Sequence, residues 1–208
     1  MIGIRLGVNI INLRLGIIWY VVTLGLVSIF YAVNVDRFLA GSIVQILFLG
    51  FALTPWLVDG GNKEKLGLVK IRWWIGLLSF IVGAAISFLY SWLTGGDLSV
   101  PQFDVRLLYI VVLAPICEEL FFRGYLQPAT QSRGKNWVGL LIVALLFTAV
   151  HLPKLFILQE GSPLDLIIIF VLAVILGIIR YTTRSVYNSI LLHLANNLIS
   201  IFFIVPQY

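Results

Sequence analysis

Long apolar stretches recur along the whole sequence, and they constrain the fold more than any other feature. A transmembrane helix needs about 20 consecutive, mostly apolar residues. Seven segments approach or reach that length: residues 15–35, 38–58, 73–94, 107–126, 137–152, 164–179 and 186–205. The chain is 61% hydrophobic and 11% charged, which leaves too little polar surface to cover a water-soluble core. We therefore expect an all-α polytopic membrane protein with about seven transmembrane helices.

The 208 residues are enough for a single membrane domain and leave no room for a sizeable soluble one. Within this domain, residues 1–106 carry three expected spans without a motif, and residues 107–198 carry all the polar motifs described below. The only cysteine, Cys117, excludes an intramolecular disulfide framework. Its expected role is that of a small buried apolar side chain.

The basic residues indicate how the chain is oriented, because cytoplasmic loops carry an excess of Lys and Arg. With the N-terminus inside, the outer side receives only Arg37, Arg106 and Lys154. The inner side receives ten: Arg5, Arg14, Lys63, Lys65, Lys70, Arg72, Arg133, Lys135, Arg180 and Arg184. We expect a cytoplasmic N-terminus and an outer C-terminus, in a bacterial or archaeal cell membrane. The net charge of +5 then reflects basic cytoplasmic loops near membrane lipid, and we expect no nucleic-acid partner. The oligomeric state stays open.

A few polar residues lie inside the apolar stretches, where an ionisable side chain is costly and therefore indicates function. Both histidines of the chain belong to this group. Its members are Glu118, Glu119 and Arg123 in the fourth stretch, His151 at the end of the fifth, and His193, Asn196 and Asn197 in the seventh. Asn196 is expected to serve helix packing.

Helical spacing arranges these residues into pairs. Glu119 and Arg123 are separated by one helical turn with the acid first, which favours an ion pair. Glu118 lies about 100° further round the helix and is free to project elsewhere. The same four-residue spacing joins Phe147 to His151 and His193 to Asn197.

Counting from two expected turns, near Gly134 and near Thr182, places the polar residues of the three stretches at similar depths. The depths agree to within about one helical turn when each residue rises ~1.5 Å. Pro128 lies between the carboxylates and the first of these turns, and we expect it to kink or break the fourth helix.

Two chemical schemes fit a carboxylate, two imidazoles and a carboxamide that face one cavity. In the first, Glu118 is a general base on water, His151 helps to hold the water, and His193 and Asn197 donate to an oxyanion. In the second, Glu118, His151 and His193 bind zinc, with water in the open position. Both schemes describe hydrolysis of an amide bond within or beside the bilayer.

Three short motifs resemble those of a known family. EELFFR at residues 118–123 resembles its EExxxR motif, FTAVH at residues 147–151 its FxxxH motif, and HLANN at residues 193–197 its HxxxN motif. The family is that of the CPBP (CAAX-processing and bacteriocin-processing, or Abi) intramembrane proteases, which includes the type II CAAX prenyl endopeptidases. All three motifs occur in family order, each on an expected span.

The resemblance implies an all-helical membrane endopeptidase with its site on the fourth, fifth and seventh spans. It implies Glu118 as the base, with His151, His193 and Asn197 completing the catalytic set. Glu119 and Arg123 support the base, and Phe147 belongs to the second motif. The resemblance implies a peptide or a lipidated protein as substrate and leaves a divalent metal such as zinc open.

Other classes of membrane protein also carry polar residues inside their spans. The sequence lacks HExxH, GxSG and GxGD, which are the signatures of the site-2, rhomboid and presenilin-like intramembrane proteases. A proton-coupled transporter also uses intramembrane Glu and His, but no repeat symmetry supports one here. A catalytically silent family member, acting as an immunity factor or membrane scaffold, is the other alternative.

Overall fold

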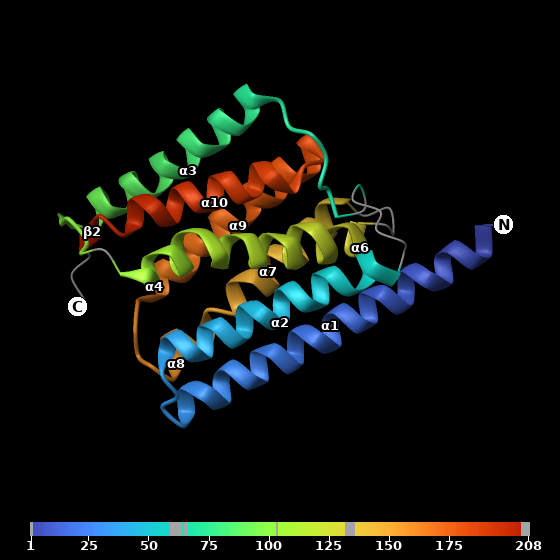
Figure 1. Cartoon of the computed structure of the whole chain (residues 1–208), viewed down its shortest axis with the longest axis horizontal. Helices are drawn as coiled ribbons and strands as arrows, with labels where there is room; N and C mark the ends of the chain where they lie inside the picture. Colours follow the sequence, from blue (N-terminus) through green and yellow to red (C-terminus); the bar gives the residue numbers. More distant parts are fainter. Residues whose placement is uncertain (1, 59–63, 65, 103, 132–135, 205–208) are drawn as a thin grey trace.

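Nearly parallel and antiparallel helices build the molecule, as Figure 1 shows. The computed structural model describes residues 2–58, 64, 66–102, 104–131 and 136–204. The long helices are α1 (Ile2–Ala32), α2 (Arg37–Val58), α3 (Trp73–Leu93), α7 (Asn136–Ala149), α9 (Pro163–Thr183) and α10 (Val186–Ser200). A short helix, α8 (Leu152–Phe156), follows α7 after one turn. The expectation of an all-α polytopic membrane protein is confirmed.

Between α3 and α7, the chain forms one uninterrupted helical run that crosses the middle of the bundle (Figure 1). It consists of α4 (Val105–Leu108), the π-helical η1 (Tyr109–Leu113), α5 (Ala114–Glu119), the π-helical η2 (Leu120–Leu126) and α6 (Gln127–Gln131). Glu118 and Glu119 therefore lie on a single α-helical segment between two wider π-helical segments. Such segments often occur at functional sites.

Each π-helical segment ends two residues before a proline, which has no N–H to continue the hydrogen-bonding pattern. The backbone N–H of Gln127 donates to the carbonyl of Phe122, five residues back. The next carbonyl, that of Arg123, would pair with Pro128, which has no N–H. The Arg180 side chain of α9 takes this position instead, with Nε 3.1 Å from the Arg123 oxygen.

The same arrangement occurs at the first π-helical segment. The N–H of Ala114 donates to the carbonyl of Tyr109, and the following carbonyl, that of Ile110, would pair with Pro115. Asn197 of α10 donates to it instead, from Nδ2 at 3.0 Å. Two side chains from neighbouring helices thus replace the two N–H groups that the prolines lack.

The sequence predicts a kink or a break at Pro128, and the break is wrong, because the helix continues to Gln131. The carbonyl of Arg123, which lacks the N–H of Pro128, is satisfied by Arg180. Arg180 is also corrected from a loop charge to a buried one, since only 8% of it is exposed. The expected turn at Gly134 lies outside the described residues.

Five helices in the described part of the chain are long and apolar enough to cross a membrane: residues 13–32, 37–54, 73–93, 136–156 and 163–183. The fourth and seventh expected spans are also helical, but the fourth contains the charged residues and α10 is 15 residues long. The seventh stretch ends early because β2 (Phe203–Ile204) pairs antiparallel with β1 (Asp97–Leu98). How many helices span the membrane stays a prediction.

Helix α10 lies directly against α3, side by side in Figure 1. The contact face of α3 consists of small side chains: Gly76, Ser79, Gly83, Ser87 and Ser91. A Cβ atom at Gly83 would lie 2.0 Å from the Leu192 carbonyl oxygen, so only glycine allows this approach. Small residues that permit close backbone contact are the usual basis of helix association in membranes.

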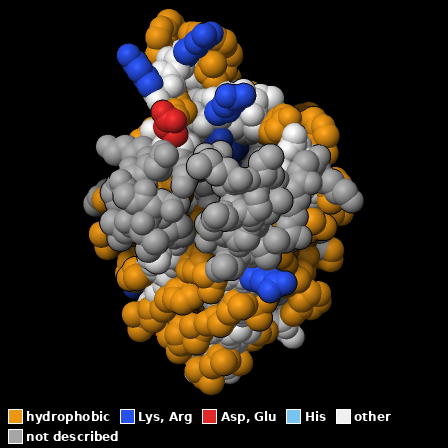
Figure 2. Space-filling view, turned by 90° about the vertical axis from the view of Figure 1, so that its right-hand side faces the viewer, with side chains coloured by type: hydrophobic (Ala, Val, Ile, Leu, Met, Phe, Trp, Pro, Cys, Tyr) orange, Lys and Arg blue, Asp and Glu red, His pale blue; other side chains and the backbone are white. Residues whose placement is uncertain are grey.

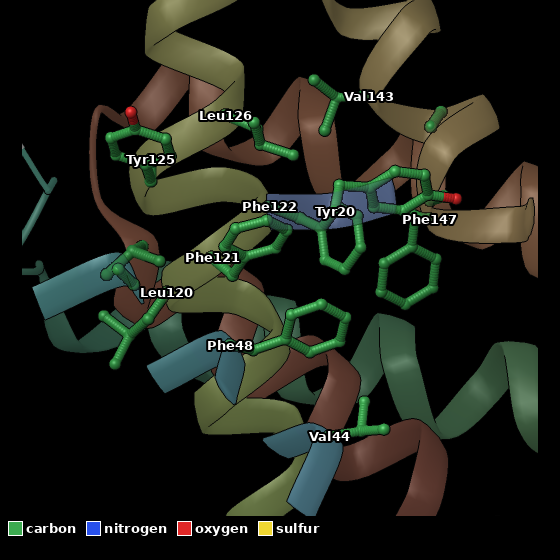
Figure 3. Close-up of a cluster of buried hydrophobic side chains, with 14 of the residues drawn as sticks. Tyr20, Val44, Phe48, Leu120, Phe121, Phe122, Tyr125, Leu126, Val143 and Phe147 are labelled. Atoms are coloured by element: carbon green, nitrogen blue, oxygen red, sulfur yellow. The ribbon is translucent and has the colours of Figure 1, made fainter. Parts of the chain in front are cut away.

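An aromatic cluster surrounds the η2 segment and joins it to α1, α2 and α7 (Figure 3). Phe48 of α2 stacks on Phe121 with ring centroids 4.7 Å apart. Phe122 meets the Phe147 ring edge to face at 5.1 Å. The Tyr20 hydroxyl of α1 donates to the Leu146 carbonyl at 2.8 Å. Tyr20 also meets Phe122 edge to face at 6.3 Å. Helices α1, α2 and α7 therefore all contact the helical run over residues 105–131, which we call the acidic helix.

Apolar side chains also cover much of the outer surface, as expected for helices that face lipid. Figure 2 looks at the end of the bundle where α1 begins, and it shows Lys and Arg side chains among apolar ones. The exposed basic side chains of the loop before α3 include Lys70 and Arg72, and Arg184 is exposed between α9 and α10. Helix α1 begins at one end of the bundle, and α10 and β2 end at the other (Figure 1).

Candidate active site

The second carboxylate of the pair is fully buried and makes the expected intrahelical ion pair. Glu119 Oε1 lies 3.0 Å from Arg123 Nη1, and neither side chain is exposed. Arg123 also donates from Nη2 to the Ala173 carbonyl of α9 at 3.1 Å. Its guanidinium lies over the Phe147 ring, 4.3 Å from the centroid. The predicted contact between Glu119 and Arg123 is confirmed.

Glu119 also orients the first histidine of the site. His193 Nδ1 of α10 lies 3.0 Å from Glu119 Oε1, the same oxygen that Arg123 contacts. Because an ionised carboxylate only accepts hydrogen bonds, Nδ1 must carry the hydrogen. The other ring nitrogen, Nε2, then faces Glu118 Oε2 across 3.9 Å. Glu118 and His193 are brought together as the sequence predicts.

Glu118 is held from α2, a helix that the sequence analysis did not place at the site. Its Oε1 accepts a hydrogen bond from Gln45 Nε2 of α2 at 2.6 Å. The side chain of Glu118 is 14% exposed, whereas Gln45 is buried at 6%. The sequence does contain a signal for Gln45, because it is a polar amide near the middle of an apolar stretch. It carries no charge, so it is not among the ionisable residues that indicate function in a membrane.

The second histidine follows α7 and precedes α8. His151 Nδ1 contacts the Phe147 carbonyl at 3.1 Å, so it donates and leaves Nε2 as the free nitrogen. The Phe147 ring lies between the two imidazoles, with centroids 5.5 Å from His151 and 5.8 Å from His193. The motif residues of α7 and α10 therefore share one aromatic neighbour.

Asn197 lies one turn after His193, but its amide is partly occupied. One N–H is used on the Ile110 carbonyl, and Oδ1 accepts from Asn196 at 3.4 Å. An amide nitrogen carries two hydrogens, so one remains for another acceptor. Cys117 is 2% exposed and packs as the expected small apolar side chain.

The side chains that could bind a metal fit one only in part. Both histidines hold Nδ1 in a hydrogen bond to oxygen, which is the usual arrangement around a ligating Nε2. However, no three His, Cys, Asp or Glu side chains of the described residues lie together so that they could hold a metal ion. Zinc bound by Glu118, His151 and His193 stays a prediction.

Comparison with known proteins identifies the family. Residues 100–199 match the model described as "Type II CAAX prenyl endopeptidase Rce1-like". This segment of the chain belongs to the Rce1-like family. The match spans all three motifs, so the resemblance to the CPBP family is confirmed. At the level of the family, the protein is a CAAX-type intramembrane peptidase, and its apolar helices make it an integral membrane protein.

A relative extends the similarity beyond the matched segment. The "Uncharacterized 24.3 kDa protein" of Escherichia coli is 27% identical over 175 residues, which cover 78% of each chain. No solved structure matches the chain.

Proposed function

We propose that the protein is an endopeptidase that hydrolyses a peptide bond of a membrane-associated protein or peptide, using water activated by Glu118. One observation supports this most directly: Glu118 Oε2 and His193 Nε2 face each other across 3.9 Å. When His193 is neutral and Nδ1 donates to Glu119, both facing atoms are hydrogen-bond acceptors. Two acceptors at this distance need a donor between them, and a water molecule supplies one O–H to each.

The reaction follows from this arrangement. Glu118 Oε2 takes a proton from the water, and the water oxygen attacks the carbonyl carbon of the substrate. The remaining amide hydrogen of Asn197 donates to the oxyanion that forms, and His151 helps to orient the reacting groups. In this scheme Nε2 of His193 accepts from the water and does not donate to the oxyanion, which differs from its role in the sequence analysis. Glu118 then passes its proton to the leaving nitrogen as the C–N bond breaks. The products are a carboxylic acid and an amine, and Glu118 is regenerated as a carboxylate.

The supporting residues keep His193 in the required state. Glu119 accepts from Nδ1, and Arg123 neutralises Glu119 in the buried interior. This fixes both the tautomer and the ring orientation of His193. A peptide with a lipidated C-terminal cysteine is the substrate class that the family description suggests.

The test uses the protein purified in detergent and a panel of synthetic peptides, prenylated and unmodified, with mass-spectrometric detection of the cut. We expect the wild type to cleave a member of this panel and Glu118→Gln to lose about 10²–10⁴-fold in rate, the usual contribution of a general base. The Glu118→Gln variant must elute as a monodisperse, folded protein. Cleavage that persists in Glu118→Gln would reject Glu118 as the base, and a wild type that cleaves nothing would favour a silent family member.

Metal removal separates the two catalytic schemes. With water activated by Glu118 alone, dialysis against a chelator leaves the cleavage rate unchanged, and we favour this outcome. Stoichiometric zinc in active protein, with activity lost to the chelator and restored by added zinc, would support the zinc alternative.

A further inference from the structure

We infer that Gln45 is a positioning residue that completes the site from α2, outside the family-matched segment. This inference rests on the proposed function, because Gln45 acts through the proposed base. Its amide nitrogen lies 2.6 Å from Glu118 Oε1. The matched segment begins only at residue 100, so none of its motifs includes this contact.

The chemistry of the pair fixes which group donates. A carboxylate accepts hydrogen bonds, so the short contact requires an N–H from Gln45. Hydrogen bonds to an ionised acceptor are short and stronger than neutral ones. Because a carboxamide does not ionise at any working pH, Gln45 binds the carboxylate form of Glu118 without competing for its proton. A histidine or an acid at the same position lacks this property.

The contact also decides which oxygen of Glu118 reacts. With Oε1 held by Gln45, rotation of the carboxylate is restricted, and Oε2 stays directed toward His193 Nε2. The proposed water needs this fixed pair of acceptors. Gln45 therefore orients the base rather than touching the substrate.

Helix α2 is itself firmly placed against the acidic helix. Val44 and Phe48, on either side of Gln45 along α2, are 4% and 0% exposed. Phe48 stacks on Phe121, three residues after Glu118 (Figure 3). A polar side chain among such apolar neighbours is costly unless it is paired. Gln45 Oε1 has no hydrogen-bond partner among the described residues. The bond from Nε2 to Glu118 is therefore the interaction that offsets the cost of burying this amide.

The first experiment measures kcat and KM of a graded series. Gln45→Met keeps the length of the side chain and removes the donor, and we expect kcat to fall about 10- to 100-fold with KM little changed, as a bond to a charged group implies. Gln45→Asn keeps a shorter donor and should retain an intermediate kcat. Thr54→Val is the matched control, because among the described residues its hydroxyl bonds to the Gly50 carbonyl of the same helix.

Two results would overturn the inference while the wild type remains active. One is a Gln45→Met variant with the kcat of wild type. The other is a series in which Met and Asn are equally impaired and equally destabilised, which would indicate a packing role alone. Thermal unfolding in detergent is recorded for every variant to separate these cases.

A second experiment does not depend on activity. In a Cys117→Ser background, Gln45→Cys combined with Glu118→Cys should be joined by a short bifunctional thiol reagent. The pair Thr54→Cys and Glu118→Cys should not react, because Thr54 lies about two and a half turns further along α2. Failure of the first pair to cross-link would overturn the placement of Gln45, and a wild type without peptidase activity would instead refute the proposed function.

Discussion

At the scale of single residues, one carboxylate oxygen organises the interior of the site. Glu119 Oε1 contacts both Arg123 Nη1 and His193 Nδ1, each at 3.0 Å. All three side chains are at least nine-tenths buried. A buried charge that loses its partner is strongly destabilising, so this group holds α10 and the acidic helix together as well as orienting His193.

Glu119→Gln should therefore impair folding, and Glu118→Gln should not. Removing the Glu119 charge leaves Arg123 buried without its counter-ion, which costs roughly 3–5 kcal/mol of the free energy of unfolding. Glu118 is more exposed and has a neutral partner, so its amide variant should unfold near the wild-type temperature. Thermal unfolding in one detergent checks both variants, and a reversed order would exchange the roles assigned to the two acids.

At the scale of secondary-structure elements, the two π-helical segments decide how the acidic helix is connected to its neighbours. Each one precedes a proline and leaves one carbonyl for a side chain of another helix. Arg180 of α9 serves the carbonyl of Arg123, and Asn197 of α10 serves that of Ile110. Substitution of Arg180 leaves the carbonyl of the fully buried Arg123 unpaired, and substitution of Asn197 leaves that of Ile110 unpaired.

Arg180→Met should lower the free energy of unfolding by about 1–3 kcal/mol, the cost of an unsatisfied buried polar group. Adding Pro128→Ala to this variant should recover part of the loss, because alanine supplies the N–H that the Arg123 carbonyl lacks. Thermal unfolding of both single variants and the double variant measures the recovery. If the double variant lost as much as the sum of the two single ones, the carbonyl would not be the group that Arg180 serves.

Gly83→Ala should displace α10 and with it His193. The added Cβ would lie 2.0 Å from the Leu192 carbonyl oxygen, so the helices must separate. Overpacking of this kind typically costs about 1–3 kcal/mol, and we expect peptidase activity to fall with it. Gly25→Ala on α1 is the control, since a Cβ there meets nothing within 4 Å. Equal behaviour of the two variants would argue against the close packing of α3 and α10.

The sequence predicted the elements well because a chain in lipid must satisfy its backbone hydrogen bonds internally, which leaves helices as the solution for long apolar runs. It also predicted the pairing of Glu119 with Arg123, which depends only on the spacing within one helix. Gln45 and Arg180 were not recognised, because their partners lie on other helices. The π-helical segments were not predicted either, because a regular period of 3.6 residues assumes that no turn of the helix is widened.

At the scale of the whole molecule, the motif-bearing part depends on the three helices before it. Helix α10 packs on the small-residue face of α3, and Glu118 is bound by Gln45 of α2. Helices α2 and α3 therefore support the site, although they carry none of its motifs. Helices that insert independently can assemble later in the membrane.

A chain divided between residues 99 and 100 tests this dependence. Residues 100–208 expressed alone should be inactive, because α10 lacks its packing partner and Glu118 lacks Gln45. Coexpression with residues 1–99 should restore cleavage of the peptide, measured in membranes. Restoration should be weaker with Gln45→Met in the first fragment. Full activity of residues 100–208 alone would contradict a role for α2 and α3.

The position of Cys117 makes its thiol a probe of how often the helices around the site open. It is the only sulfhydryl of the chain, it adjoins the proposed base, and it is 2% exposed. A thiol reagent can reach it only while the surrounding helices part, so the labelling rate of the unmodified protein follows the frequency of that local opening. The same rate, recorded with and without a bound peptide, reports whether a substrate holds the helices together or drives them apart.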